Sequence, residues 1–256
     1  MRRLMVLAAC LAMLAVPATA TATTVSARGA GITATLSFRG SGPRVTDERL
    51  SISQHGKVVY DQPVPTTGCS RVCAPLLHPV AVADLYGDGF QEVILNLWSG
   101  GADCCTLADV FVHSSAMNSY VLDQHNFGPA GFVLRNIGPH GRPLFVSADR
   151  AYYCEFSSCA ASVLPLQILE YSGERFIDVT RSQPRLIRAD AARIWKLYIT
   201  HIHTGQSAFA AWAADEQNLG RGALVTSTLR REVAGGHLST GFAAALRRFL
   251  SGRGRG

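Results

Sequence analysis

The stretch HPVAVADLYGDGFQEVILNLWSG, residues 78–100, decides the fold of this 256-residue chain. Two apolar runs flank a loop rich in glycine and aspartate, which is the pattern of strand, turn and strand. Two more runs with strand character follow, TLADVFVHS at 106–114 and SYVLDQHNFG at 119–128. Together they predict an antiparallel unit of four strands at about residues 77–128.

A fainter copy of this unit follows, in which FVLRNIGPHGRPLFVSA overlays the first copy so that Asn136 falls on Asp84 and Gly141 on Gly89. The strands after it, with a hairpin turn at Gly173, complete a second unit at about residues 129–180. A period near fifty residues with four strands per copy is typical of propeller-like blades, although two copies do not close a ring. A sheet over 32–64 supplies a third unit, and the QHGK segment predicts one of its hairpin turns.

From Pro184 the spacing of apolar residues changes to three and four, which predicts helices. The first begins at Pro184, the next two cover about 206–219 and 223–234, and the last begins with Ser239 as its N-cap. We therefore expect a mainly β protein with a C-terminal α unit. It consists of antiparallel propeller-like or sandwich-like sheets at 25–182, a small helical bundle at 184–250 and a flexible tail at 251–256.

The first twenty residues have the pattern of a signal peptide. Arg2 and Arg3 precede an apolar run at 4–16, and Ala18-Thr19-Ala20 fits a signal-peptidase site. A lipoprotein signal ending at Cys10 is disfavoured because the apolar segment before it is short. No later run reaches the roughly 18 apolar residues that a membrane helix needs, so we expect no transmembrane segment in the mature chain. The interpretation is export to the periplasm or the extracellular space.

Six cysteines remain after the signal peptide, an even number that suits an oxidising compartment. They are Cys69, Cys73, Cys104, Cys105, Cys154 and Cys159. One solution bridges the two closely spaced pairs locally and so joins Cys104 to its neighbour, a strained arrangement. The favoured alternative joins Cys69 and Cys73 to the Cys104-Cys105 pair across adjacent strands, and closes Cys154 to Cys159 as a local loop. The spacings are not those of a CxxC redox motif, so a structural role is expected.

The loop of the first unit carries a candidate calcium site. Asp84, Asp88 and Glu92 supply carboxylates, and the backbone carbonyl of Phe90 can complete the coordination sphere. Calcium prefers hard oxygen ligands of this kind, and the glycines between them permit the tight turn that lets such ligands converge. The alternative is a glycine-rich turn whose carboxylates cap backbone amides.

At these residues the chain resembles the FG-GAP or VCBS-type repeats of integrin-like and bacterial secreted β-propellers, whose loops read D-x-D-G-D-G-x-x-E/D. The resemblance covers residues 82–95 well and 134–147 poorly. It implies calcium held by Asp84, Asp88 and Glu92, within an extracellular sheet used for adhesion or ligand display. Tyr86 stands where the family has its second carboxylate. The second copy keeps only Asn136, so its loop is expected to be metal-free.

No local motif for catalysis is present, since the chain contains neither HExxH nor GxSxG. His201 and His203 can ligate zinc together from a strand but point apart on a helix. Asp215 and Glu216 occupy adjacent helical positions and are interpreted as a solvated helix face. A further set of aromatic residues fits either a carbohydrate- or peptide-binding face or the packing of the β core. These are Trp98, Tyr120, Phe127, Tyr152 and Tyr153.

The formal charge of +6 arises from 24 basic residues, of which only two are lysine. The basic C-terminus, with Arg247, Arg248, Arg253 and Arg255, can contact anionic polymers or envelope lipids, or form a solvated helix end. We expect an exported, non-catalytic binding or structural protein of the cell envelope or extracellular space. Its expected partner is an unknown protein or carbohydrate and not a nucleic acid. The alternative is a secreted hydrolase whose catalytic groups converge from distant segments.

Overall fold

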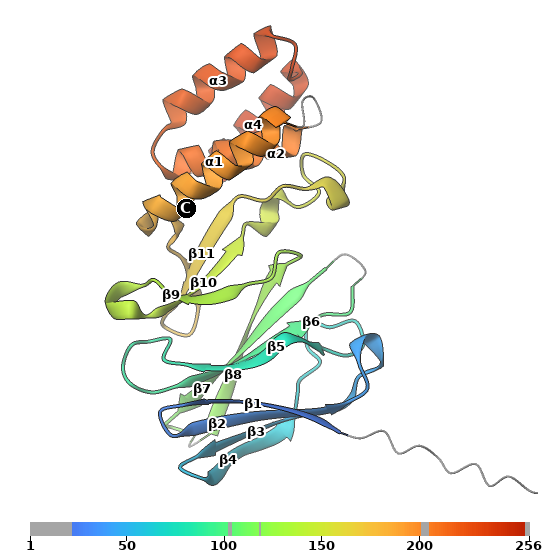
Figure 1. The fold of residues 1–256 in the computed structure, drawn as a ribbon, viewed down its shortest axis with the longest axis vertical. Coiled ribbons are helices and arrows are strands. Elements are labelled where there is room, and N and C mark those ends of the chain that lie inside the picture. The colour runs from blue at the N-terminus through green and yellow to red at the C-terminus, as the bar shows by residue number, and fades with distance from the viewer. Residues whose placement is uncertain (1–21, 102–103, 118, 201–204, 254–256) are drawn as a thin grey trace, which may run out of the picture.

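The computed structural model describes residues 22–101, 104–117, 119–200 and 205–253. Within them, three antiparallel sheets of four strands each are followed by four helices, which confirms the expected fold class. The sheets and the helical unit succeed one another along the longest axis of the molecule (Figure 1). The arrangement is a sandwich-like stack, and the predicted signal peptide lies outside the described residues.

The first sheet contains β1 (Thr23–Gly29), β2 (Ile32–Arg39), β3 (Thr46–Gln54) and β4 (Lys57–Pro63), paired in chain order. The predicted QHGK turn joins β3 to β4 through His55 and Gly56, which both have positive φ, at 49° and 82°. Two such residues match the right-handed twist of the flanking strands. The sheet begins one strand earlier than the predicted span of 32–64, because β1 pairs along the whole edge of β2.

The two predicted four-stranded units form the second and third sheets. The second contains β5 (Ala74–Ala83), β6 (Glu92–Trp98), β7 (Thr106–Ser114) and β8 (Ser119–Gly128). The third contains β9 (Val133–Asn136), β10 (Pro143–Ala148), β11 (Leu166–Tyr171) and β12 (Phe176–Asp178). Both are simple meanders in which each strand pairs with its neighbours in the chain.

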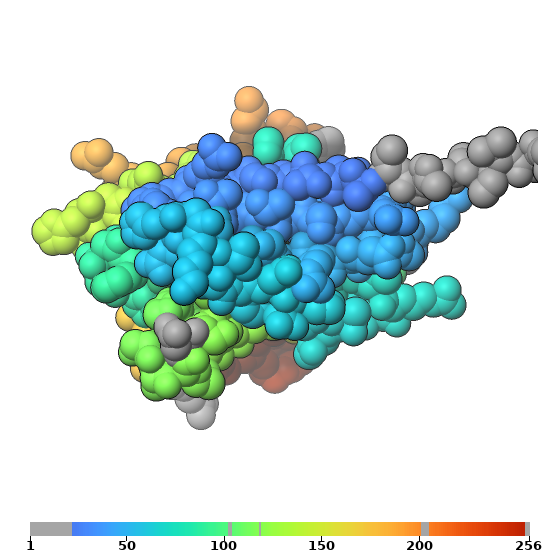
Figure 2. Space-filling model, turned by 90° about the horizontal axis from the view of Figure 1, so that it is seen from below, coloured from blue at the N-terminus to red at the C-terminus, as the bar shows by residue number. Residues whose placement is uncertain are grey.

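The second sheet lies between the first and the third and is buried on both faces. Successive residues of a strand point to opposite faces, so alternate residues pack against different sheets. Leu95 of β6 packs toward the first sheet with Ile52, whereas Ile94 packs toward the third sheet with Phe145. All four side chains are at most 1% exposed. Burial of each contributes about 1.5–3 kcal/mol, and this double core explains the consecutive apolar residues Val93, Ile94 and Leu95 in β6. Figure 2 shows the end of the molecule formed by the first sheet, which covers the layers above it.

The helical unit contains α1 (Pro184–Thr200), α2 (Gln206–Asn218), α3 (Gly222–Ala234) and α4 (Thr240–Arg253), close to the predicted spans. The hydroxyl of Ser239 accepts a hydrogen bond from the Phe242 amide at 3.1 Å, which confirms it as the N-cap of α4. Helix α2 is enclosed by its neighbours, with every residue from Ser207 to Glu216 buried. Residues 251–253, predicted as the start of a flexible tail, instead form the last turn of α4. No helix in the described ranges is long and apolar enough to cross a membrane.

The disulfide bonds are all local, so the favoured cross-strand pairing of Cys69 and Cys73 with Cys104 and Cys105 is wrong. Cys69 bonds to Cys73, Cys104 to Cys105, and Cys154 to Cys159. The two loops concerned do lie side by side. Hydrogen bonds join them instead: the Ser70 amide donates to the Ser99 carbonyl at 2.8 Å, and the Ser99 amide donates to the Cys105 carbonyl at 2.9 Å.

Candidate functional site

The calcium-type loop between β5 and β6 uses its carboxylates on its own backbone. Asp84 accepts hydrogen bonds from the amides of Gly87, Asp88 and Gly89 at 2.6–3.1 Å. Asp88 accepts from the Phe90 amide at 2.9 Å, and Glu92 accepts from the Leu85 amide at 2.7 Å. These are the contacts of the amide-capping alternative. Calcium binding by this loop stays a prediction.

The surroundings of Glu92 are those of a buried carboxyl group. Its side chain lies at the start of β6 and the residue is 2% exposed. The pKa of Glu92 is raised to about 7, chiefly by burial and also by the nearby carboxylates of Asp88 and Asp84. Phe90 has its side chain in solvent, at 66% exposure. The described residues contain no group of three or more His, Cys, Asp or Glu side chains arranged to hold a metal ion.

The loop after β5 and the loop after β9 face each other. Asp84 and Asn136, which the sequence overlay predicts to be equivalent, line the same cavity of about 470 Å³ together with His140 and Arg142. Arg142 bridges the two sheets, because its guanidinium donates to the Tyr86 carbonyl at 3.4 Å and pairs with Glu170 at 2.5 Å. The Arg142 guanidinium lines the same cavity as Asp84, and its positive charge disfavours a second cation there.

The carboxylates of α2 are buried, so their interpretation as a solvated helix face is wrong. Asp215 is fully buried and Glu216 is 5% exposed, because α2 is the central helix of the unit. Glu216 is neutralised by an ion pair with Arg221 at 2.5 Å. The pKa of Asp215 is raised to about 9, chiefly by burial and also by the adjacent carboxyl group of Asp190 on α1. Asp215 is therefore a protonated structural group at neutral pH.

The remaining predicted candidates contribute packing or fall outside the description. Tyr120 and Phe127 are at most 8% exposed and belong to the cores of the sheets, and Tyr152, 2% exposed, belongs to the core of the helical unit and also lines the pocket described below. His201 and His203 lie outside the described residues. Zinc ligation by this pair is therefore not tested.

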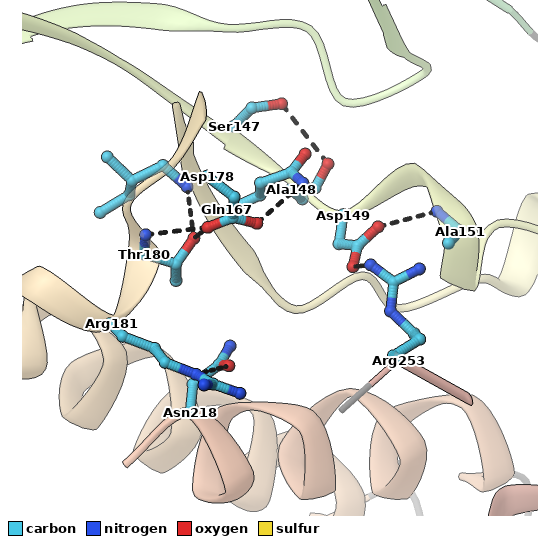
Figure 3. A network of polar contacts seen from close by, with 11 residues as sticks. Ser147, Ala148, Asp149, Ala151, Gln167, Asp178, Thr180, Arg181, Asn218 and Arg253 are labelled. Carbon is cyan, nitrogen blue, oxygen red and sulfur yellow. Dashed lines mark hydrogen bonds and ion pairs between the residues drawn. The ribbon is translucent and has the colours of Figure 1, made fainter. Parts of the chain in front are cut away.

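A polar pocket of about 320 Å³ lies where the third sheet meets the helical unit. Four chain segments build its polar wall: residues 149–152 after β10, residues 178–181 from the end of β12, the last turn of α2 and the last turn of α4 (Figure 3). Its apolar floor comes from Pro165, Leu166, Ala214 and Leu250. The polar lining residues are Asp149, Tyr152, Asp178, Arg181, Gln217, Asn218 and Arg253.

Asp149 holds the pocket together across the boundary between sheet and helices. One carboxylate oxygen accepts from the Ala151 amide at 3.0 Å, and the other forms an ion pair with Arg253 of α4. The Arg253 guanidinium also lies 5.6 Å from the ring centre of Tyr152, within cation–π range. Burial raises the pKa of Asp149, and its contacts with Ala151 and Arg253 act in the opposite direction.

Asp178 forms the opposite wall and is equally constrained. One of its oxygens accepts from the amide and the hydroxyl of Thr180, at 2.9 and 2.6 Å, and the other accepts from Gln167 at 3.3 Å. Arg181 donates to the Asn218 side chain at 3.5 Å. The remaining guanidinium N–H groups of Arg181 and the side-chain amide of Gln217 have no hydrogen-bond partner within the described ranges. These groups are therefore available to a ligand.

Sequence reasoning missed this pocket because its polar residues are scattered from 149 to 253 and form no motif. The one local signal is that Asp149 directly follows the predicted strand segment that ends at Ala148. No known protein family matches the chain, and no curated protein or solved structure compared with it is significantly similar. The site must therefore be interpreted from its geometry alone.

Proposed function

We propose that this chain is an exported, non-catalytic binding protein whose ligand occupies the pocket between the third sheet and the helical unit. The observation that carries the proposal is the set of fixed polar groups around an apolar floor. Asp149 and Asp178 are held rigid by hydrogen bonds and by Arg253, while Arg181 and Gln217 keep free donors. Small-molecule sites combine such a floor with a few preset polar groups.

The proposed ligand is a neutral carbohydrate unit. Two carboxylates and two guanidinium groups line the pocket, so its formal charges cancel and it offers no net attraction to a cation or an anion. A sugar ring presents several hydroxyl groups, each of which both donates and accepts, together with an apolar face. A volume of about 320 Å³ suits a ligand of one or two such rings.

A secreted hydrolase is the second candidate, because two carboxyl groups flank one pocket and burial raises the pKa of Asp149. Glycoside hydrolysis needs one carboxyl group to donate a proton and another to act as base or nucleophile. Here both oxygens of Asp149 and both oxygens of Asp178 already accept hydrogen bonds or an ion pair. These contacts favour a binding role over catalysis.

In this proposal the three sheets and the calcium-type loop have a structural role. Three stacked four-stranded sheets and the resemblance to FG-GAP repeats support an extracellular display scaffold, with the calcium loop at an edge of the second sheet. In this proposal the sheets position the pocket and the helical unit closes it.

The test is calorimetric titration of the oxidised protein, without residues 1–20, with a panel of neutral mono- and disaccharides. We expect one saccharide class to bind, and Gln217→Ala and Arg181→Ala to weaken that binding by about tenfold. Gln206→Ala, an exposed glutamine at the other end of α2, is the matched control and should bind like the unmodified protein.

Two outcomes would overturn the proposal. One is that no saccharide binds at millimolar concentration, and the other is that Gln217→Ala binds as tightly as the control variant. A parallel assay for release of reducing ends from oligosaccharides separates binding from catalysis. Turnover that Asp178→Asn abolishes would establish the hydrolase instead.

A further inference from the structure

The charge of this protein is divided unevenly between its two parts. Residues 22–183 contain 11 basic and 14 acidic residues, whereas residues 184–256 contain 11 basic and only 4 acidic residues. The sheets are therefore slightly acidic, and the helical unit has a formal charge of +7. The helical unit also lies at one end of the longest axis, so the molecule is electrostatically polarised along its length (Figure 1).

The four acidic residues of the helical unit do not neutralise its outer surface. Asp190 pairs with Arg193 at 2.7 Å, and Glu216 pairs with Arg221 at 2.5 Å. Glu232 contacts His237 at 2.9 Å. The fourth, Asp215, is buried inside the unit. Each acidic group is thus either paired or removed from the surface.

Six exposed basic residues remain, and we call them the cationic cap. None has an ion-pair or hydrogen-bond partner for its side chain among residues 22–101, 104–117, 119–200 and 205–253. At 3.6 residues per turn, Arg185 and Lys196 lie opposite the buried Ile194 of α1, and Arg248 lies opposite the buried Leu246 of α4. The cationic cap consists of Arg185, Arg188, Lys196, Arg230, Arg247 and Arg248.

We infer that the cationic cap binds a flexible anionic polysaccharide, independently of the ligand in the pocket. Five of its six residues are arginines, whose planar guanidinium group forms paired hydrogen bonds with carboxylate or sulfate groups. The six charges are spread over three helices that all pack on α2, which suits a polymer chain that follows the surface. None of the six residues lines the pocket.

A membrane surface fits this unit less well. A helix that lies in a bilayer interface exposes a continuous apolar face. In α1 and α4 the apolar faces are buried against the rest of the unit. The large apolar side chains exposed on the described helices are Ile199 and Leu224, one each on α1 and α3. The attraction is therefore electrostatic, and added salt should weaken it steeply.

The test compares binding to heparin and polygalacturonate, as sulfated and carboxylated polysaccharides, with binding to neutral dextran. We expect both anionic polymers to bind at low ionic strength and dextran not to bind. The triple variant Arg185→Gln, Arg188→Gln, Lys196→Gln should lose about tenfold in affinity and show a flatter salt dependence. The matched control replaces three exposed arginines of the sheet region whose side chains have no ion-pair or hydrogen-bond partner among the described residues: Arg28→Gln, Arg44→Gln, Arg71→Gln.

The control variant has the same net charge as the test variant, so it separates the cationic cap from charge in general. Circular dichroism and melting temperature of both variants confirm that each is folded. Three results would overturn the inference: no binding of anionic polysaccharide at low ionic strength, equal losses in the two variants, or preferential binding to phosphatidylglycerol vesicles or duplex DNA. If no saccharide binds in the pocket, the inference about the cationic cap still stands, because none of the six residues of the cap lines the pocket.

Discussion

Asp149, immediately after β10, and Arg253, at the end of α4, form an ion pair across 104 positions of the chain. This pair joins the third sheet to the last helix and forms one wall of the pocket. The Asp149 side chain is 13% exposed and that of Arg253 is 39% exposed, so water screens the pair only in part. The contact therefore links the stability of the helical unit to the geometry of the proposed binding site.

We expect Arg253→Ala to lower the free energy of unfolding by about 2 kcal/mol, because it leaves the mostly buried Asp149 carboxylate without its cation. Urea unfolding measures the change. A double-mutant cycle with Asp149→Asn checks its origin, since the second substitution should cost little once Arg253 is gone. Additive losses in the double variant would show that the two residues do not interact.

Asp215→Asn should remove a pH dependence of stability. The Asp215 carboxyl group titrates near 3.8 in the unfolded chain and near 9 in the folded protein. Below pH 3.8 the carboxyl group is protonated in both the folded and the unfolded protein, and Asp215 does not lower the free energy of unfolding. Between the two values only the unfolded state releases the proton, so stability falls as the pH rises, by up to about 1.4 kcal/mol per pH unit.

The variant should therefore become progressively more stable than the unmodified protein between about pH 5 and 9. Urea unfolding at several pH values measures the difference. Glu155→Gln, at an exposed carboxylate, is the control and should leave the pH profile unchanged. A constant difference between Asp215→Asn and the unmodified protein across this range would contradict the prediction.

The calcium-type loop allows metal binding to be separated from backbone capping. Without calcium, Asp84→Ala should cost about 1–2 kcal/mol, since three amide groups lose their acceptor, and Asp88→Ala should cost less because it caps one. If the loop also binds calcium, millimolar calcium raises the melting temperature of the unmodified protein and has no effect on Asp88→Ala. Equal melting temperatures with and without calcium would leave capping as the function of these carboxylates.

The disulfide pairing can be checked by digestion of the non-reduced protein with a protease that cleaves before aspartate. Residues 61–83 then contain Cys69 and Cys73, and residues 103–108 contain Cys104 and Cys105. Local pairing predicts two separate peptides, each with an internal disulfide in the mass spectrum. A single peptide that joins the two segments would restore the cross-strand alternative.

Much of the architecture follows from local patterns in the chain. The apolar runs on either side of the Asp84 loop predicted the second sheet, and the three- and four-residue spacing after Pro184 predicted the helices close to their observed bounds. Ser239 was recognisable as an N-cap because capping depends on a residue and the amides that directly follow it. The resemblance to FG-GAP repeats stays a hypothesis, since the three sheets stack and no ring is formed by the described strands.

Other properties depend on how distant segments pack, and local patterns do not contain them. The cysteines pair within their own loops, although two of these loops are neighbours. Asp215 has the spacing of a surface residue but is buried, because three other helices surround α2. The sequence by itself determined the secondary structure, the turn chemistry and the uneven distribution of charge. Only the tertiary structure decided which polar groups meet at the pocket, because burial and contact depend on packing between segments such as Asp149 and Arg253.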